Sequence, residues 1–413
     1  MSVIEFQPKL AAERDHCPVL HVVYREGLGS VFEPMVVSPV TRLVRAGFPA
    51  RIAVFCPIGE MVRPRLRKRW QGIERNIAVE LDGSVHRLPS PPSRAMNAWN
   101  EAAYFQRWFD WHYPKPNSPV LLHCRGSHAT HLGLGVRRNR DVKVIYDMRG
   151  VEHAEQLYVR NDLKSANNLE DLEATAARSS DAVICVSNRM KEFACGRYGI
   201  DAGKIAVAPC CVDMSAPDPM LARNANRLKL GITERFVVAY CGGAHSWQLP
   251  RQSTELFLKI QSAIPRAHYL VLTPAVEQLK HILQQLNVRS SDATVMNVPH
   301  DQVATHLAAA DVGLLIRERS LINEVAAPVK FGEYLRSSLP VIISEGVGDY
   351  SQLVRSEQLG FVLDDHRDPS AFLTDYVANP IAWRDRCRRA AHEHLSSDLL
   401  VNSWMDLYRQ LSL

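Results

Sequence analysis

The chain alternates between short apolar runs and longer segments in which apolar side chains recur at helical spacing. Six runs stand in the first half, at 19–24, 51–56, 120–125, 143–148, 181–187 and 204–209. Six more stand in the second half, at 236–242, 268–273, 293–298, 312–317, 340–345 and 360–365. Runs that are apolar throughout, rather than alternating, are typical of parallel strands covered on both faces. Helices are predicted between them, for example at 95–111, 151–179, 250–263 and 302–310.

Two series of about six strands predict two doubly wound α/β domains. Segment 211–232 is polar and turn-rich, without a clear strand, and we interpret it as the linker. The carboxyl ends of the strands should face a shared cleft, because open α/β sheets bind ligands at that edge. The segment 403–413 predicts a final helix that must dock on an apolar surface. Its apolar face consists of Trp404, Leu407, Tyr408 and Leu411.

Composition supports a cytoplasmic protein with proper cores. The 413 residues are 46% hydrophobic, which favours two or three domains over one. There is no run of 18 apolar residues and no signal-peptide core in the first 17 residues, so neither a membrane span nor a leader is expected. Nine cysteines are scattered without a CxxC pair, as in a reducing compartment.

The net charge of +5 is modest but unevenly spread. In RPRLRKRW, residues 63–70, five of eight residues are Arg or Lys, and Trp70 closes the segment. One interpretation is a solvated helix face. The other is a patch for an anionic membrane surface, where each basic residue adds roughly 1 kcal/mol and tryptophan suits the interface. Nucleic acid is disfavoured, since no aromatic residues are interleaved as stacking platforms.

The first strand leads into a glycine-containing turn with Gly27 and Gly29. Such a turn can bring the backbone close to a phosphate. The third glycine of a dinucleotide fingerprint is missing, since Phe32 stands there, and the second strand ends at Cys56 and Pro57 rather than at an acid. A dinucleotide site is therefore not predicted. A plain tight turn and a loop that approaches an anionic ligand both remain open.

Polar side chains stand at the ends of two further strands of the first half. His123 and Arg125 end one strand, and Asp147 and Arg149 end the next. The three histidines within 121–131 lack metal-ligand spacing and a carboxylate, so a metal is not expected. Strand-end Arg and His suit substrate oxygens. For Asp147 and Arg149 the alternative is a structural pair that caps the following helix.

In the second half the segment 323–349 carries the strongest signal. Pro328 suits the first position of a helix, and the free amides that follow form an anion site to which Lys330 adds a charge. Glu333 stands one turn later and can accept hydrogen bonds from sugar hydroxyls. A diphosphate joined to a ribose needs that combination; the alternative is a surface helix with a Lys–Glu pair. Gly242 and Gly243 form a second candidate phosphate loop, or a plain turn.

These residues resemble those of the GT-B glycosyltransferases of family 4 type over nearly the whole chain. The matching segments in the first half are LLHCRG, YDMRG, AVICVSNRM and GIDAGKIAVAPCCVD. Those in the second half are YCGG, DVGLLIR, APVKFGEYLRSSLPVI and GVGD. The resemblance implies two facing Rossmann-like domains with a C-terminal helix that returns to the N-terminal domain. The K-F-G-E-Y and D-x-R-G forms are similar to the branch that builds bacterial surface polysaccharides.

The resemblance also implies an activity and a division of labour. The expected reaction is a retaining, metal-independent sugar transfer from a nucleoside-diphosphate sugar of UDP or GDP type to a glycan or lipid-linked acceptor, without a cofactor. Residues 1–213 would bind the acceptor, 214–393 the donor, and 394–413 would form the returning helix. A lipid-linked acceptor would place the protein at the inner face of the membrane. Alternatives are a nucleotide-sugar epimerase and a catalytically silent partner in a polysaccharide assembly complex.

The family's motif residues carry over with departures. Glu333 matches the second glutamate of the E-x7-E motif, whereas the first position is Val325 and Glu324 stands one residue early. The family arginine after the first strand of the second domain is absent, so Lys330 needs helpers for the diphosphate. On the acceptor side Arg125 replaces the common histidine.

The resemblance thus implies three sets of site residues. The catalytic set is Arg125, His123, Arg149 and Glu324. The donor-binding set is Lys330, Glu333, Gly242, Gly243, Arg251, Arg317, Asn323 and Val329. The acceptor-binding set is Gly27, Gly29 and Asp147.

Overall fold

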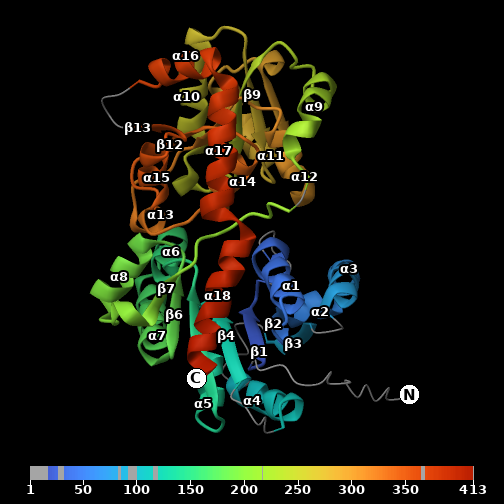
Figure 1. Ribbon diagram of the computed structural model, residues 1–413, viewed down its shortest axis with the longest axis vertical. Helices are drawn as coiled ribbons and strands as arrows, with labels where there is room; N and C mark the ends of the chain where they lie inside the picture. Colours follow the sequence, from blue (N-terminus) through green and yellow to red (C-terminus); the bar gives the residue numbers. More distant parts are fainter. Residues whose placement is uncertain are drawn as a thin grey trace.

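Two parallel β-sheets, each covered by helices, lie at opposite ends of an elongated molecule and are joined by the C-terminal helices (Figure 1). The computed structural model describes residues 17–26, 32–81, 85–91, 100–114, 120–215, 217–363 and 368–412, with side chains described outside 76–81. The predicted pair of doubly wound domains is thereby confirmed.

The N-terminal sheet has seven strands in the order β3-β2-β1-β4-β5-β6-β7, and all its pairings are parallel. The strands are β1 Val19–Tyr24, β2 Ala50–Pro57, β3 Val85–Ser90, β4 Val120–Arg125, β5 Val142–Met148, β6 Ala182–Cys185 and β7 Ile205–Val207. The helical segments are η1 Glu33–Val37, α1 Ser38–Arg45, α2 Ile58–Val62, α3 Pro64–Leu81, α4 Glu101–His112, α5 Ser127–Arg137, α6 Glu152–Arg160, α7 Leu163–Ser179, α8 Asn188–Tyr198 and η3 Ala202–Lys204.

The C-terminal sheet has six strands in the order β10-β9-β8-β11-β12-β13, again all parallel. The strands are β8 Phe236–Cys241, β9 Ala267–Leu272, β10 Ala293–Met296, β11 Val312–Leu315, β12 Val341–Ser344 and β13 Gly360–Leu363. The helical segments are η4 Pro219–Ala222, α9 Arg223–Lys229, η5 Ser246–Gln248, α10 Pro250–Ala263, α11 Val276–Gln285, η6 Ser290–Asp292, α12 His300–Leu307, α13 Leu321–Glu324, α14 Val329–Arg336, α15 Tyr350–Ser356, α16 Ser370–Ala378, α17 Pro380–Leu395 and α18 Ser397–Ser412.

Each sheet reverses its strand order once, and these reversals place the site. The order turns between β1 and β4 in the first sheet and between β8 and β11 in the second. At such a switch point the loops leave the carboxyl edge toward opposite faces and open a crevice. The side chains to consider therefore follow β1, β4 and β5 in one domain and β8 and β11 in the other.

Two local predictions in the N-terminal domain were incomplete. Strand β3 was missed because Val85–Ser90 is half-polar and contains Pro89; it is the outermost strand of its sheet, where proline is tolerated. The helix predicted at 151–179 is two helices. Asn161 adopts a left-handed conformation with φ 49°, and Asp162 then caps α7 by accepting a hydrogen bond from the Ser165 amide.

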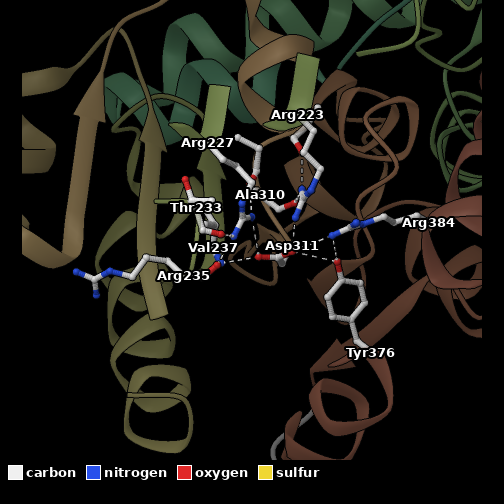
Figure 2. A network of polar contacts seen from close by, with 11 residues as sticks. Arg223, Arg227, Thr233, Arg235, Val237, Ala310, Asp311, Tyr376 and Arg384 are labelled. Atoms are coloured by element: carbon white, nitrogen blue, oxygen red, sulfur yellow. Dashed lines mark hydrogen bonds and ion pairs between the residues drawn. The ribbon is translucent and has the colours of Figure 1, made fainter. Parts of the chain in front are cut away.

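Segment 211–232 is more than a linker, because it contains η4 and α9, and α9 is fixed to the C-terminal domain. Figure 2 shows Arg223 and Arg227 of α9 and Arg384 of α17 pointing at the carboxylate of Asp311, just before β11. Arg223 Nη2 donates to Asp311 Oδ1 at 2.6 Å and Arg384 Nη2 at 2.9 Å. Polar sequence here therefore reflects a buried ion-pair network rather than a solvated connection.

The C-terminal helix docks as its apolar face predicted. Trp404 and Tyr408 are buried in the N-terminal core with Val36 and Leu43, and Leu407 and Leu411 pack at its edge. The preceding helix α17 packs on the C-terminal domain, where Leu395 lies in a cluster with α14. The chain thus crosses from one domain to the other between α17 and α18 (Figure 1). This confirms the expected return of the C-terminal helix to the N-terminal domain.

Candidate active site

On the N-terminal side of the cleft, two arginines lie beside the carboxylate of Asp147 at the end of β5. Its Oδ2 lies 3.2 Å from Arg149 Nε and 3.7 Å from Arg125 Nη1. Arg125, the last residue of β4, also donates from Nε to Glu26 Oε2 at 2.7 Å. Adjacent parallel strands bring these ends together, so the expected proximity of Arg125, Asp147 and Arg149 is observed.

The cluster does not cap helix α6, which was the alternative interpretation. The first amides of α6, those of Glu152 and His153, donate instead to the buried carboxylate of Glu173. Asp147 and Arg149 do form a pair, but the pair lies at the carboxyl end of β5 and does not cap the helix. Burial acts to raise the pKa of Asp147, yet the charge of Arg149 and the neighbouring His123 and Arg125 outweigh it and hold that pKa well below its usual range.

The two arginines keep donors that no protein group accepts. Arg125 Nη1 and Arg149 Nη2 are buried without a hydrogen-bond partner, although their side chains are only 10% and 11% exposed. An unsatisfied donor of a charged group is costly, on the order of 1–3 kcal/mol or more. Two such donors at the carboxyl edge of the sheet are suited to oxygens of a bound ligand.

His123 does not reach the cleft, contrary to the expectation that it contacts substrate. Its ring is 1% exposed and stacks on His21 with centroids 4.4 Å apart. Its Nδ1 lies 2.6 Å from the hydroxyl of Tyr408, and its Nε2 lies 3.4 Å from Asp147 Oδ2. Burial lowers the pKa of His123, so the ring is neutral near pH 7. Asp147 is likewise 2% exposed, so the predicted direct contact of its carboxylate with an acceptor is not open to it.

On the C-terminal side, helix α14 presents Lys330 and Glu333 as predicted, with Pro328 as its N-terminal cap. Lys330 Nζ donates to Glu333 Oε2 at 2.7 Å, and His300 Nε2 lies 3.3 Å from Glu333 Oε1. Burial would raise the pKa of Glu333, but His300 and Lys330 lower it, so the carboxylate is charged. Phe331 N donates to the Pro328 carbonyl at 3.0 Å, so the amides of Val329 and Lys330 are the ones free at the start of the helix.

His300 was missed by the sequence analysis. It follows β10 and opens α12, so it is a polar residue after a strand end, the same signal that identified Arg125. A small cavity of about 90 Å³ separates His300, Val329 and Glu333 from Pro34 and Met35 of the N-terminal domain. The predicted donor residue Val329 therefore lines the space between the domains.

The loop that contains Gly242 and Gly243, after β8, is held by Gln248, a residue that no motif indicated. Gly243 N donates to Gln248 Oε1 at 2.9 Å, and a Cβ on Gly242 would lie only 2.7 Å from that oxygen. The hydroxyl of Tyr240 donates to the Gly243 carbonyl at 2.7 Å. A side chain at Gly242 would displace the end of the Gln248 side chain, and one at Gly243 would lie 3.3 Å from the His245 ring, so the two glycines fit closely within the loop.

Of three predicted helpers of the donor site, Arg251 and Asn323 have other partners and Arg317 keeps an unpaired Nε. The guanidinium of Arg251 lies 3.3 Å from Glu255 and donates to Gln285 at 3.1 Å on the exposed side of α10 and α11. Asn323 is 3% exposed and donates to the Glu318 carbonyl at 2.9 Å, which holds a loop. Arg317 follows β11 and is half-buried; burial lowers its pKa, and its Nε lacks a partner.

The shifted first glutamate lies apart from Glu333. One residue turns a helix by about 100°, so Val325 enters the core at 3% exposure while the Glu324 side chain stays 44% exposed, 3.5 Å from Arg319. Glu324 lines a pocket of about 280 Å³ together with Gly346 and Gly348. Gly27 and Gly29 lie outside the described residues.

Hydrogen bonds join the N-terminal and C-terminal domains directly. Ser187 Oγ donates to the Val325 carbonyl at 2.6 Å, and the amides of Asn188 and Arg189 donate to the carboxylate of Asp349 at 2.7 and 3.2 Å. The C-terminal domain thus caps helix α8 of the N-terminal domain. The GVGD segment, which ends in Asp349, has this role in the domain contact.

The basic segment 63–70 forms the start of α3, where the side chains of its arginines and lysine are exposed. Trp70 is not exposed: it is 0% accessible, with its ring 5.7 Å from that of Phe32. The suggestion that Trp70 enters a membrane interface is therefore wrong, because its ring is part of the domain core. The exposed charges remain compatible with either a solvated face or an anionic surface.

Among the residues described, no helix is long and apolar enough to span a membrane. The same residues contain no group of three or more His, Cys, Asp or Glu side chains arranged to hold a metal ion. The positive charges near the cleft are those of arginine and lysine side chains.

The comparisons with known proteins agree with this architecture. Residues 36–216 match the family model described as Glycosyltransferase Family 4. The fold is similar to HepE from Anabaena in complex with UDP, with a TM-score of 0.68 at 12% identity over 95% of this chain and 100% of that one. A glycosyltransferase from Rickettsia africae also has 0.68, at 14% identity over 96% and 99%. WaaG, a glycosyltransferase involved in lipopolysaccharide biosynthesis, has 0.64, at 15% identity over 95% and 99%.

At these identities the solved structures show the fold, and the family model matches residues 36–216, less than half of the chain. No curated protein matches the chain in sequence. Residues 36–216 are thus similar to a family of retaining enzymes that transfer a sugar from a nucleotide-sugar. The whole chain has the GT-B fold.

Proposed function

We propose that the chain moves a sugar from a UDP- or GDP-sugar to a glycan or lipid-linked acceptor in cell-surface polysaccharide synthesis. The observation that carries the proposal is the group at the start of α14, where buried Glu333 is held between Lys330 and His300. HepE, of similar fold, was crystallised with UDP-glucose, and WaaG is involved in lipopolysaccharide biosynthesis. Those likenesses support the donor class and the kind of pathway.

In the proposed donor site, Glu333 accepts hydrogen bonds from the ribose and Lys330 faces the diphosphate. Bond cleavage leaves negative charge on the nucleoside diphosphate, and preorganised donors there stabilise the transition state. Lys330 and the first amides of α14 supply that charge and those donors without a metal. Burial lowers the pKa of Lys330, but Cys241 and Glu333 raise it further, so the ammonium stays charged.

In the proposed acceptor site, Arg125 and Arg149 bind oxygens of the acceptor or of the transferred sugar with their free donors. This pair takes the place of the histidine that many relatives have, and it keeps its charge at every physiological pH. The acceptor hydroxyl would then attack on the face from which the diphosphate leaves, as retention in this family implies. For a lipid-linked acceptor, the exposed basic residues at 63–69 provide contact with the inner face of the membrane.

Thermal unfolding with UDP, GDP, ADP and CMP tests the donor site. A ligand at 100 times its dissociation constant stabilises by about 2.7 kcal/mol, which raises Tm by several degrees. One nucleoside diphosphate should produce that shift, and Glu333→Ala should abolish it. Glu255→Ala, which removes an exposed glutamate of the same domain, is the matched control and should leave the shift intact. Absence of any shift in the wild type would overturn the donor site.

Lys330→Ala tests the leaving-group role. We expect turnover per folded molecule to fall about 100-fold or more, the usual cost of removing a charge-stabilising donor, and Tm to fall as well because buried Glu333 loses a partner. Release of nucleoside diphosphate from the donor identified by unfolding gives the rate. Normal turnover in a folded Lys330→Ala protein would exclude the role.

A further inference from the structure

A line of buried polar side chains leads from the C-terminal helix to the arginines of the cleft. The hydroxyl of Tyr408 on α18 lies 2.6 Å from His123 Nδ1. On the other side of the ring, His123 Nε2 lies 3.4 Å from Asp147 Oδ2, and that oxygen lies 3.2 Å from Arg149 Nε. Tyr408 of α18, His123 of β4, Asp147 of β5 and Arg149 just after β5 thus form one series, whose first contact joins residues 285 positions apart. Its last two contacts are at ion-pair distance, since neither His123 Nε2 nor Arg149 Nε makes a hydrogen bond.

The short contact with Tyr408 and the nearby carboxylate of Asp147 favour one arrangement of the protons. Burial raises the pKa of Tyr408 well above its usual range, so the hydroxyl keeps its proton. The hydroxyl lies 3.4 Å from His21 Nε2 but 2.6 Å from His123 Nδ1, so it donates to His123. His123 is neutral and carries a single ring proton, which must then be on Nε2, the atom that faces Asp147. The neighbouring ring of His21 is also neutral, because burial holds its pKa well below the usual range. The hydroxyl of Tyr408 therefore determines which nitrogen of the His123 ring carries the proton, and this is the nitrogen that faces Asp147.

Docking of the helix does not require these polar groups. Trp404 and Tyr408 already bury large rings in the apolar cluster of the N-terminal domain, and a phenylalanine would fill the same volume. Placing a hydroxyl and two imidazoles in that cluster costs free energy unless they are hydrogen-bonded. Beyond His123, the series reaches Asp147 and the arginines beside it, Arg149 and Arg125. The polar groups of the series therefore matter for the cleft rather than for the packing of the core.

We propose that Tyr408 and His123 are positioning residues, which fix the orientation of Asp147 and through it the guanidinium groups of Arg149 and Arg125. The C-terminal helix is then part of the scaffold of the acceptor side, although Tyr408 itself is fully buried and does not reach the cleft. This inference rests on the proposed function of the two arginines. It does not involve the donor site, which lies in the other domain.

Tyr408→Phe tests the proposal, because it removes one hydroxyl and keeps the ring. The rate of nucleoside diphosphate release from UDP-glucose, with water as acceptor, should fall about tenfold, since a small misplacement of a positioning group reduces turnover. KM for the donor and the Tm shift produced by UDP should not change. A GDP-sugar replaces UDP-glucose if GDP is the nucleotide that binds.

Tyr376→Phe is the matched control. Its hydroxyl is also buried, lies 2.7 Å from Arg384 Nη2 and 3.3 Å from Asp311 Oδ1, and belongs to the network of Figure 2. It should lower Tm about as much as Tyr408→Phe, with turnover unchanged. Equal turnover losses in both variants, or none in Tyr408→Phe, would overturn the proposal.

His123→Gln and the double variant add a second readout. If both residues act through Asp147, the double variant should lose no more turnover than the worse single variant, whereas independent effects would multiply. Nitrogen NMR of the histidine rings, assigned with His123→Gln, reads the tautomer without any activity. The wild type should show a protonated Nε2 at His123, and Tyr408→Phe should show a mixture of tautomers. An unchanged ring spectrum overturns the proposal even if no nucleotide binds and the proposed function has failed.

Discussion

Two buried aspartates, Asp147 and Asp311, are each surrounded by arginines, and the difference between them separates function from scaffold. Asp311 stands just before β11, at the amino end of its strand, whereas Asp147 is at the carboxyl end of β5. Around Asp311, Arg223 also donates to the Ala308 carbonyl and Arg227 to that of Ala309. Around Asp147, Arg125 Nη1 and Arg149 Nε and Nη2 lack a hydrogen-bond partner, whereas among the three arginines around Asp311 only Arg384 Nε does. The Asp311 network is nearly satisfied and joins elements; the Asp147 group keeps several free donors that a ligand can use.

The first and largest expected effect concerns Asp311. Asp311→Asn leaves three guanidinium groups without their carboxylate in a buried place, which should lower the free energy of unfolding by about 3–5 kcal/mol. Urea unfolding measures it, and the remaining folded protein should keep its turnover. A loss of turnover per folded molecule would remove the distinction between the two aspartates.

Asp147→Asn should show the reverse pattern. Arg125 retains Glu26, so only Arg149 loses its sole carboxylate, and the loss of stability should be smaller, about 1–3 kcal/mol. Turnover should fall about 100-fold, because both arginines lose their orientation. Steady-state kinetics with donor at saturation measures this. An Asp147→Asn enzyme that is unstable but normally active would place Asp147 with the scaffold.

Replacement of one arginine in each group sharpens the comparison. Arg149→Lys keeps the charge but loses the planar fork, and turnover should fall about tenfold. Arg384→Lys makes the same change beside Asp311, and there turnover should stay the same while Tm falls by a few degrees. If Arg384→Lys reduces turnover as much as Arg149→Lys, location at the carboxyl edge is not what matters.

The smallest effect is the dependence of stability on pH. The pKa of Asp147 is lower in the folded than in the unfolded protein, so its ionised form stabilises the fold above about pH 4, the unfolded value. That contribution is lost as pH falls toward the folded pKa. The difference in unfolding free energy between wild type and Asp147→Asn should therefore shrink between pH 7 and pH 3. A constant difference would mean that the carboxylate charge contributes nothing.

Much of the site could be predicted because strand ends are visible in the sequence. A polar residue that closes an apolar run has to lie at the edge of a parallel sheet, which is how Arg125, Asp147 and Arg149 were found together. Lys330 and Glu333 followed from the start of a helix. The same patterns could not tell a side chain that faces the cleft from one that faces the core, and so His123 and Trp70 were assigned to surfaces they do not reach.

The sequence by itself determined the two doubly wound domains, the described strands other than β3 and the apolar face of the last helix, because hydrophobic periodicity is a local property of the chain. Only the tertiary structure decided the partners of the polar residues. Tyr408 contacts His123, Arg223 contacts Asp311, and Asp349 caps α8. Each of these contacts joins residues far apart in sequence, and a buried charge or hydroxyl acquires its role from whichever partner the fold places beside it.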